Sequence, residues 1–187
     1  MHTLKFELPA WIDDVVDWDR PYPTVEDRVG LAIRLSRENV ERDGAGPFGA
    51  AVFETETGRL VSVGVNRVVP ARNSVLHAEI VALMFAHRRT GAYALNGDGL
   101  PAHDLATSCD PCAMCLGATL WSGVRRVLAG ADREDAMAVG FDEGPVFPES
   151  FAYLADRGVE VIRGIRRAEA REVLQAYVGR GGRIYNG

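Results

Sequence analysis

Apolar runs typical of β-strands alternate with amphipathic helical segments along most of this 187-residue chain. Two Val-rich runs, 48–53 and 60–65, flank Glu56-Thr57-Gly58 and predict a hairpin. The later segments predict helices over 24–43, 74–91, 112–121 and 167–178, and strands over 104–108, 124–129 and 159–162. This order, with one further helix before the last strand, predicts a three-layer α/β/α sandwich with helices on both faces of a mixed sheet.

The length and composition suit one soluble domain. Hydrophobic residues make up 47% of the chain and charged residues 25%, close to the globular average. We expect residues 1–23, rich in Trp, Pro and Asp, to form an irregular N-terminal extension, and residues 24–187 to form the domain itself. The net charge of −5 offers no general attraction to a phosphate backbone. Because the chain shows no signal-like or bilayer-spanning apolar run, we expect a cytoplasmic protein that binds neither membrane nor nucleic acid.

All three cysteines, Cys109, Cys112 and Cys115, fall within seven residues. A disulfide framework would distribute its cysteines, because a bridge that closes a long loop contributes most to stability. Cys112 and Cys115 are three residues apart at the start of an expected helix, so both sulfurs can face one point. The spacing therefore indicates a metal or redox site.

The second informative fragment is His77-Ala78-Glu79, near the start of another expected helix. One imidazole and two thiolates supply the three protein ligands of a catalytic zinc and leave the fourth position for water. His77 and Glu79 would point to opposite sides of an ideal helix, but first-turn side chains lean towards the helix N-terminus and can converge there. Such a water becomes a nucleophile at neutral pH, and Glu79 can carry its proton to a leaving nitrogen.

Three other interpretations of the cysteines stay open. Cys112 and Cys115 alone are also typical of a thioredoxin-like redox pair or of half a zinc knuckle. With Cys109 as a fourth ligand beside His77, the site would be a closed structural zinc centre, as in a non-enzymatic interaction domain. Cys109 ends a predicted strand, however, where a free cysteine is commonly a small buried hydrophobe. Glu79 would have no role in a structural site, so we favour the open, catalytic zinc site.

Taken together, His77-Ala78-Glu79 and Pro111-Cys112-Ala113-Met114-Cys115 resemble the signature of the zinc-dependent cytidine deaminase superfamily. The resemblance covers nearly the whole chain after Thr24. It implies a five-stranded mixed sheet between helices, and one Zn²⁺ per chain held by His77, Cys112 and Cys115. It also implies that Glu79 is the catalytic proton carrier of a hydrolase that removes an amine.

Further local features are similar to the bacterial guanine deaminases of this superfamily. They are Gly46-Pro47-Phe48-Gly49-Ala50, Asn66, Trp121 and Gly140-Phe141-Asp142-Glu143, with Ile184-Tyr185-Asn186-Gly187 at the end of the chain. The resemblance implies hydrolysis of guanine to xanthine and ammonia. It also implies a homodimer in which this C-terminal segment closes a partner's site.

A planar base needs apolar walls and a few polar contacts at its edge. Phe48, Trp121 and Tyr185 are the candidate walls, and Asn66 is a candidate amide for a ring nitrogen or carbonyl. The alternative is a purely structural role for each residue. Phe48 and Trp121 would then pack in the core, Tyr185 would lie in a frayed chain end and Asn66 would stabilise a turn.

The second catalytic carboxylate is expected in the loop after residue 140. By resemblance Glu143 faces the purine, where it would bind a ring N–H or the leaving amine. The neighbouring Asp142 is its rival and a further candidate for substrate contact, as is Ala78. The sequence alone leaves the choice between Glu143 and Asp142 open.

Other substrates of the same chemistry are alternatives. Cytosine, cytidine, guanosine and aminotriazines fit a pocket of this kind. A tRNA adenosine deaminase would need a basic surface, whereas Arg88-Arg89 and Arg125-Arg126 are small clusters in an acidic chain.

Overall fold

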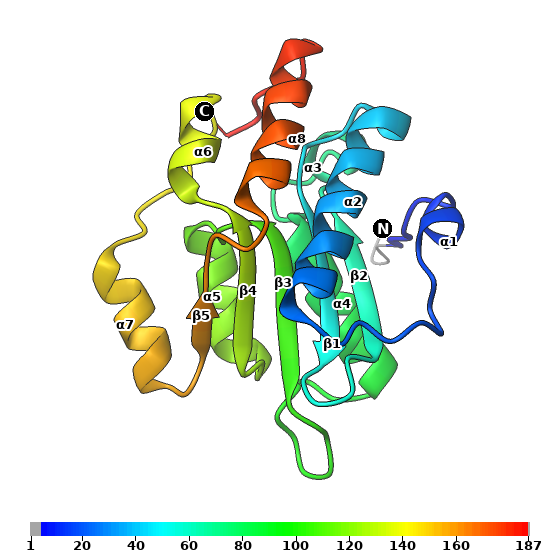
Figure 1. Cartoon of the computed structure of the whole chain (residues 1–187), viewed down its shortest axis with the longest axis vertical. Helices are drawn as coiled ribbons and strands as arrows, with labels where there is room; N and C mark the ends of the chain where they lie inside the picture. The colour runs from blue at the N-terminus through cyan, green and yellow to red at the C-terminus, as the bar shows by residue number, and fades with distance from the viewer. Residues whose placement is uncertain (1–4, 187) are drawn as a thin grey trace.

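The computed structural model describes residues 5–186, which form five strands in the order β2-β1-β3-β4-β5 (Figure 1). β1 pairs antiparallel with β2 and β3, while β3, β4 and β5 run parallel. The five-stranded mixed sheet is therefore confirmed. Its strands are β1 (Gly49–Glu54), β2 (Leu60–Val65), β3 (His103–Cys109), β4 (Arg126–Ala131) and β5 (Glu160–Ile162).

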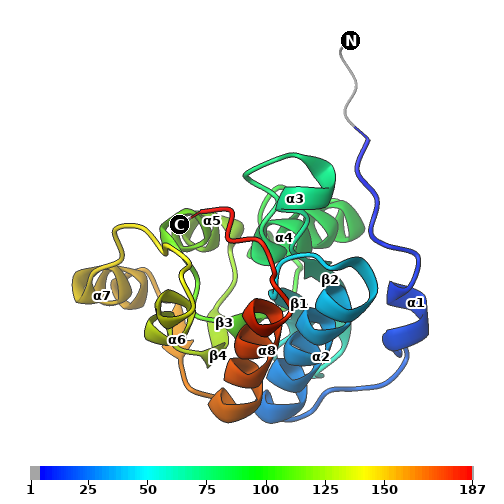
Figure 2. The ribbon, with the colours of Figure 1, turned by 90° about the horizontal axis from the view of Figure 1, so that it is seen from above.

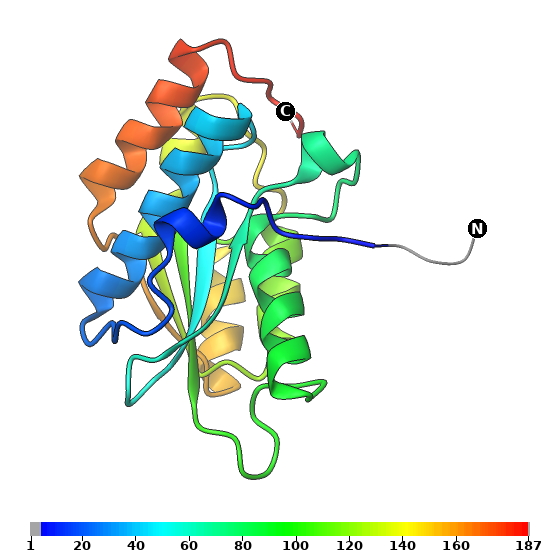
Figure 3. The same ribbon diagram turned by 90° about the vertical axis from the view of Figure 1, so that its right-hand side faces the viewer.

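Helices cover both faces of the sheet, as the three-layer prediction requires (Figure 3). The helices α2 (Val25–Asp43) and α8 (Arg167–Gly179) pack on one face, and α4 (Ala78–Thr90), α5 (Ala113–Ser122) and α7 (Pro148–Asp156) lie on the other. Phe53 of β1 packs in the cluster with α2 and α8, whereas its neighbour Val52 packs against α4. Successive strand side chains point to opposite faces, so one apolar strand serves two cores.

Three short helices add to the predicted order. These are α1 (Ile12–Val15), α3 (Val68–Ala71) and α6 (Arg133–Ala138), and because of α6 the segment between β4 and β5 holds two helices where the sequence predicted one. The extension before α2 lies on the body, and its residues Ile12, Val15, Val16 and Tyr22 are buried in the core beneath α2. None of the helices between residues 5 and 186 has the length and apolar character that a bilayer span requires.

The helix predicted from residue 74 begins later, at Ala78. His77 is the N-cap residue and has extended backbone, with ψ of 156°. It follows the turn in which the backbone N–H of Leu76 donates to the carbonyl of Asn73. The hydrophobic periodicity continued into this turn, so the sequence could not show where the first helical hydrogen bond would form.

Two features fix the helices that bear on the site. Thr24 caps α2 by accepting a hydrogen bond from the backbone N–H of Asp27, and Gly44 ends that helix in the left-handed region. Gly64 lets α4 approach β2, because a Cβ at this position would lie 2.2 Å from the carbonyl oxygen of Ala78. The first turn of α4 thus rests directly on the strand.

Candidate metal and active site

The predicted metal ligands meet at the end of the sheet where β3 and β4 finish and α4 and α5 begin. His77 is the N-cap of α4, Cys112 is the N-cap of α5, and Cys115 lies in the first turn of α5. β3 ends at Cys109, so only a short connection separates the strand from the ligands of α5. Both helix N-termini present positive partial charge here, which favours thiolates.

The donor atoms have the spacing of a tetrahedral zinc site. Nδ1 of His77 lies 3.4 Å from Sγ of Cys112 and 3.7 Å from Sγ of Cys115, and the three donors lie within 4.8 Å of one another. Zinc–sulfur and zinc–nitrogen bonds of ordinary length at a tetrahedral angle predict a nitrogen–sulfur separation of about 3.6 Å. Two sulfurs and one imidazole are also the donor chemistry that zinc prefers. The cluster therefore fits one zinc ion.

The surroundings of Cys112 favour its thiolate form. A hydrogen bond from Cys115, together with the one from His77, lowers the pKa of Cys112 to about 4. Cys112 is thus held as a thiolate, the form that binds a metal.

Cys109 is not part of this cluster. Its buried Sγ donates to the carbonyl of Asp132 at 3.7 Å, and burial raises the pKa of the thiol well above its usual range. Among residues 5–186 the metal-ligating group has three members, His77, Cys112 and Cys115. This arrangement favours the open site over the closed centre with four ligands.

Two buried carboxylates lie beside the metal ligands. Glu79 is 8% exposed and Glu143 is 5% exposed. Burial raises the pKa of Glu79 to about 7 and that of Glu143 to about 8. Both groups can therefore bind and release a proton near neutral pH, as a general acid or base must.

The structure separates the two rival carboxylates. Glu143 lines the pocket, whereas the side chain of Asp142 is exposed and accepts a hydrogen bond from the backbone N–H of Gly144 at 2.8 Å. The backbone N–H and carbonyl of Asp142 instead bond Asn186. The expected side-chain contact of Asp142 with substrate is thus not supported by its position.

A small pocket joins the metal ligands to the expected substrate residues. Its cavity of about 10 Å³ is near the volume that one water needs, about 10–15 Å³. It is far smaller than an ordinary small-molecule pocket of roughly 300 Å³ or more. The lining side chains therefore nearly fill this pocket. The lining residues are Phe48, Asn66, His77, Glu79, Asp110, Cys112, Glu143, Tyr185 and Asn186.

Two expected substrate contacts do not line this pocket. The expectation that Trp121 forms a wall of the substrate site stays a prediction, because the residue is 77% exposed in the last turn of α5 and lies outside the pocket of its own chain. The cause is helix rise, which carries a residue six positions beyond Cys115 about 9 Å along the axis. Ala78 is fully buried at the start of α4, where its side chain packs into the core beneath the helix.

The C-terminal segment closes the pocket of its own chain. Figure 2 shows it running from α8 across the end of the sheet towards α5. The ring of Tyr185 packs against those of Phe141 at 5.3 Å and His77 at 6.5 Å, measured between ring centroids. Asn186 accepts from the backbone N–H of Asp142 at 3.1 Å and donates from Nδ2 to its carbonyl at 2.7 Å. Gly187 lies outside the described residues, and exchange of the segment with a partner stays a prediction.

Three polar atoms of the lining residues lack hydrogen-bond partners within the described part of the chain. They are Nδ2 of Asn66, the hydroxyl of Tyr185 and Oδ1 of Asn186, all buried. Asn66 and Tyr185 meet over Gly46, where a Cβ would lie 2.7 Å from the tyrosine hydroxyl. A buried polar atom without a partner is costly unless a ligand pairs with it. The pocket thus offers donors and an acceptor to the polar edge of a ligand.

Sequence reasoning missed two lining residues, Asp110 and Asn186. Asp110 is 3% exposed and accepts from Nε of Arg163 at 2.8 Å. The sequence feature that could have indicated Asp110 is its position immediately before Pro111-Cys112. For Asn186 it is the position next to Tyr185. Nothing in their residue types distinguished them from ordinary loop residues.

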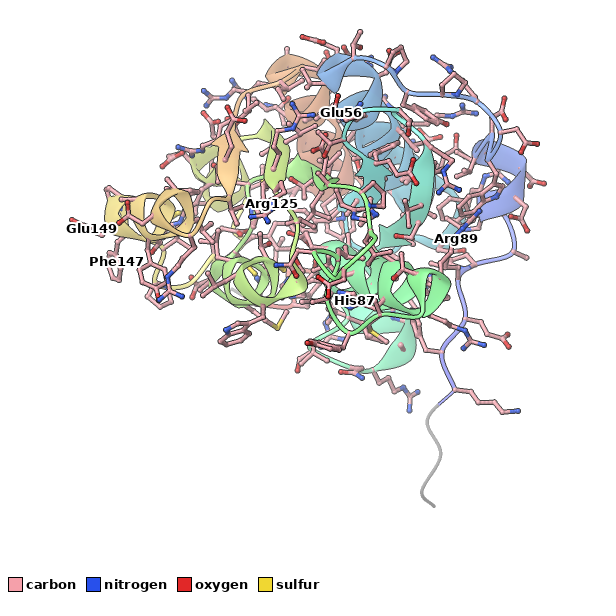
Figure 4. The ribbon with its side chains drawn as sticks, turned by 90° about the horizontal axis from the view of Figure 1, so that it is seen from below. Glu56, His87, Arg89, Arg125, Phe147 and Glu149 are labelled. Atoms are coloured by element: carbon pink, nitrogen blue, oxygen red, sulfur yellow. The ribbon has the colours of Figure 1, made fainter. Side chains whose placement is uncertain are left out.

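The small basic clusters lie away from this site. Arg89 is near the end of α4 and Arg125 precedes β4, so both sit at the opposite end of these elements from the metal ligands. Figure 4 views that end and shows the two labelled arginines well apart. Neither cluster lines the pocket.

Comparisons with known proteins agree with this geometry. The model of the cytidine and deoxycytidylate deaminase zinc-binding region matches residues 24–131. Guanine deaminase of Bacillus subtilis is 36% identical over 118 residues, which span 63% of this chain and 71% of that protein. The solved structure of guanine deaminase from Nitrosomonas europaea has a TM-score of 0.90 at 41% identity and covers 95% of this chain and 97% of its own. A tRNA-specific adenosine deaminase of Buchnera aphidicola is 28% identical over 73% of this chain and 83% of its own length.

Proposed function

Because this chain belongs to the cytidine and deoxycytidylate deaminase zinc-binding family, we propose that it hydrolyses guanine to xanthine and ammonia. One observation carries the proposal. A three-ligand zinc cluster, two buried carboxylates that titrate near neutral pH and three unpartnered polar atoms converge on one pocket. Two similar solved structures support guanine as the substrate. One is named a guanine deaminase, and the other, at 42% identity and a TM-score of 0.92, holds 2,6-diaminopurine.

The residues divide the chemistry among them. Zinc held by His77, Cys112 and Cys115 supplies, when bound, a water of lowered pKa. Glu79 accepts a proton from that water and delivers it to a ring nitrogen. It then accepts the remaining proton of the hydroxyl group added to the ring carbon and delivers it to the amine, which leaves as ammonia as the carbon–oxygen double bond forms. A group with a pKa of about 7 suits both tasks, because it is neither fully protonated nor fully ionised at neutral pH.

Recognition of the base falls to the walls and the unpartnered atoms. Phe48 and Tyr185 contact the faces of the ring, and Nδ2 of Asn66 donates to a ring nitrogen or carbonyl. Glu143 accepts a hydrogen bond from a ring N–H or from the leaving amine. The Asn66 contact uses a buried polar atom that the described part of the chain leaves without a protein partner.

The proposal also covers the oligomeric state and the cellular location. We expect a cytoplasmic homodimer whose protomers exchange their C-terminal segments. Support for the exchange comes from the resemblance of Ile184-Tyr185-Asn186 to the tail of the guanine deaminases. Gly179, Gly181 and Gly182 before it would also allow the chain to turn towards a neighbour.

An ammonia-release assay tests the function. Zinc-loaded protein is given guanine, guanosine, adenine, cytosine, cytidine and small aminotriazines, and the ammonia released from each is measured, with xanthine from guanine followed by its absorbance. We expect guanine to have the highest kcat/KM. Faster turnover of cytosine or cytidine would replace the proposed substrate with a pyrimidine.

The Glu79→Gln variant is the matched control for that assay. It keeps the shape and hydrogen-bonding reach of the side chain but removes the proton carrier. Turnover should fall by about 10²–10⁴, the usual contribution of general acid–base catalysis, while the zinc content stays unchanged. Near-normal turnover would remove Glu79 from the mechanism.

A further inference from the structure

The loop that carries Glu143 is held by one arginine of the neighbouring helix. Arg133 begins α6, and its guanidinium donates to the carbonyl oxygen of Gly144 at 3.0 Å and to that of Val146 at 3.2 Å. Within residues 5–186 Arg133 forms no ion pair, so these carbonyls are the main partners of its charged end. The planar fork of an arginine spans two acceptors at once, which a lysine ammonium does not.

Asp110 fixes Arg133 relative to the metal ligands. Its Oδ2 accepts from the backbone N–H of Arg133 at 3.1 Å, and its own backbone N–H donates to the carbonyl of Ala131 at 2.8 Å. Arg163 holds the same carboxylate from the segment after β5. Since Asp110 lies two residues before Cys112, a continuous set of bonds connects the metal-binding segment, α6 and the Glu143 loop.

The other side of the loop is tied to α5. The carbonyl of Glu143 accepts from the backbone N–H of Ala113 at 3.0 Å, between the two cysteine ligands. Gly144 then turns the chain with φ of +68°. The loop that carries Glu143 is therefore held from two elements, by the backbone of Ala113 in α5 and by Arg133 of α6.

We propose that Arg133 is a positioning residue that sets Glu143 against the substrate, and that Asp110 aims Arg133. This inference rests on the role proposed for Glu143 in the deamination. Without the guanidinium, the carbonyls of Gly144 and Val146 lose their partners and the loop relaxes towards water. A displacement of about 1 Å is enough to slow an enzyme by roughly 10².

Hydrogen–deuterium exchange tests the positioning without any substrate. The backbone amides of residues 142–144 and 146 should exchange faster in Arg133→Met than in the native protein. Arg167→Met is the control, because Arg167 bonds Asp135 of α6 at 2.7 Å and, within residues 5–186, forms no hydrogen bond with the loop. Unchanged exchange in Arg133→Met, or an equal increase in both variants, would overturn the proposal.

Turnover of guanine tests the action through Glu143. Arg133→Met should lower kcat by about tenfold or more with KM and zinc content little changed, and Arg133→Lys should lie between it and the native protein. In a Glu143→Gln background, adding Arg133→Met should cost less than about twofold, because both changes remove the same contact. An undiminished cost in that background would show that Arg133 does not act through Glu143. If the native protein released no ammonia from guanine, the proposed function would fail, while the exchange experiment would still decide the positioning.

Discussion

At the scale of single residues, the site depends on which of several similar side chains is buried. Glu143 and Asp142 are adjacent carboxylates, yet Glu143 lines the pocket and Asp142 faces solvent. Likewise Cys109 and Cys112 are three residues apart, and Cys112 lies with His77 while Cys109 bonds a carbonyl of the next segment. The residue type predicts which chemistry is available. The local backbone determines which of two residues of the same type reaches the site.

Replacing the cysteines one at a time separates the open zinc site from the closed one. Cys109→Ser should retain about one zinc per chain, because three protein ligands suffice for a catalytic site. Cys115→Ser, a change of the same size and kind, should lose the metal. Inductively coupled plasma mass spectrometry of the purified variants measures both. Loss of zinc from Cys109→Ser would establish four protein ligands and end the hydrolytic mechanism.

Part of the candidate site could be predicted from the sequence, and part could not. The spacing of His77, Glu79, Cys112 and Cys115 predicted a cluster that the structure brings together. The sequence did not show that Trp121 lies outside the pocket of its own chain, because an aromatic residue on a ligand helix does not indicate how far along the axis it lies from the ligands. Asp110 was missed for the opposite reason, since its carboxylate matters through the backbone N–H and the arginine it bonds, and neither partner is adjacent in sequence.

At the scale of elements, strands and long helices were predicted well and their ends less well. Period-2 and helical patterns identify buried faces, and the three-layer arrangement follows from them. The start of α4 was set four residues too early, and α6 was merged with α7. These ends depend on which backbone groups find partners across the fold, such as the Asp110 contact that meets the start of α6.

The packing of α4 on β2 should control the zinc site. In Gly64→Ala the new Cβ would meet Ala78 and Ala82, so α4 must move and carry His77 with it. Overpacking of this kind costs about 1–3 kcal/mol, which for a chain of this size lowers the melting temperature by roughly 2–10 °C. Differential scanning calorimetry measures the loss, and competition with a chelator should show faster release of zinc.

Gly179→Ala is the control for that change. A Cβ at Gly179, the last residue of α8, meets nothing within 4 Å. Its melting temperature should equal that of the native protein or be slightly higher, because alanine is the better helix former, and its zinc release should be unchanged. Equal behaviour of the two variants would mean that close contact between β2 and α4 is not what places His77.

At the scale of the whole molecule, the question is which chain closes which site. The hydroxyl of Tyr177 donates to the carbonyl of Arg183 at 2.7 Å, and Gly182 packs so tightly on the Tyr177 ring that a Cβ would lie 2.5 Å from it. These contacts direct the segment onto its own pocket. The resemblance implies exchange between protomers instead, and the same closing contacts serve either arrangement.

Complementation between two inactive proteins distinguishes the arrangements. Deleting residues 183–187 should leave zinc and fold intact and sharply lower turnover of guanine, because Tyr185 no longer excludes water. The Glu79→Gln protein has an intact segment but no proton carrier. If segments are exchanged, mixed dimers restore sites that combine an intact Glu79 with a partner's segment, and activity returns when the two proteins are unfolded together and refolded. Sedimentation checks that both are dimers. Dimers that stay inactive on mixing would establish that each chain closes its own site, because no mixed dimer would then contain a complete one.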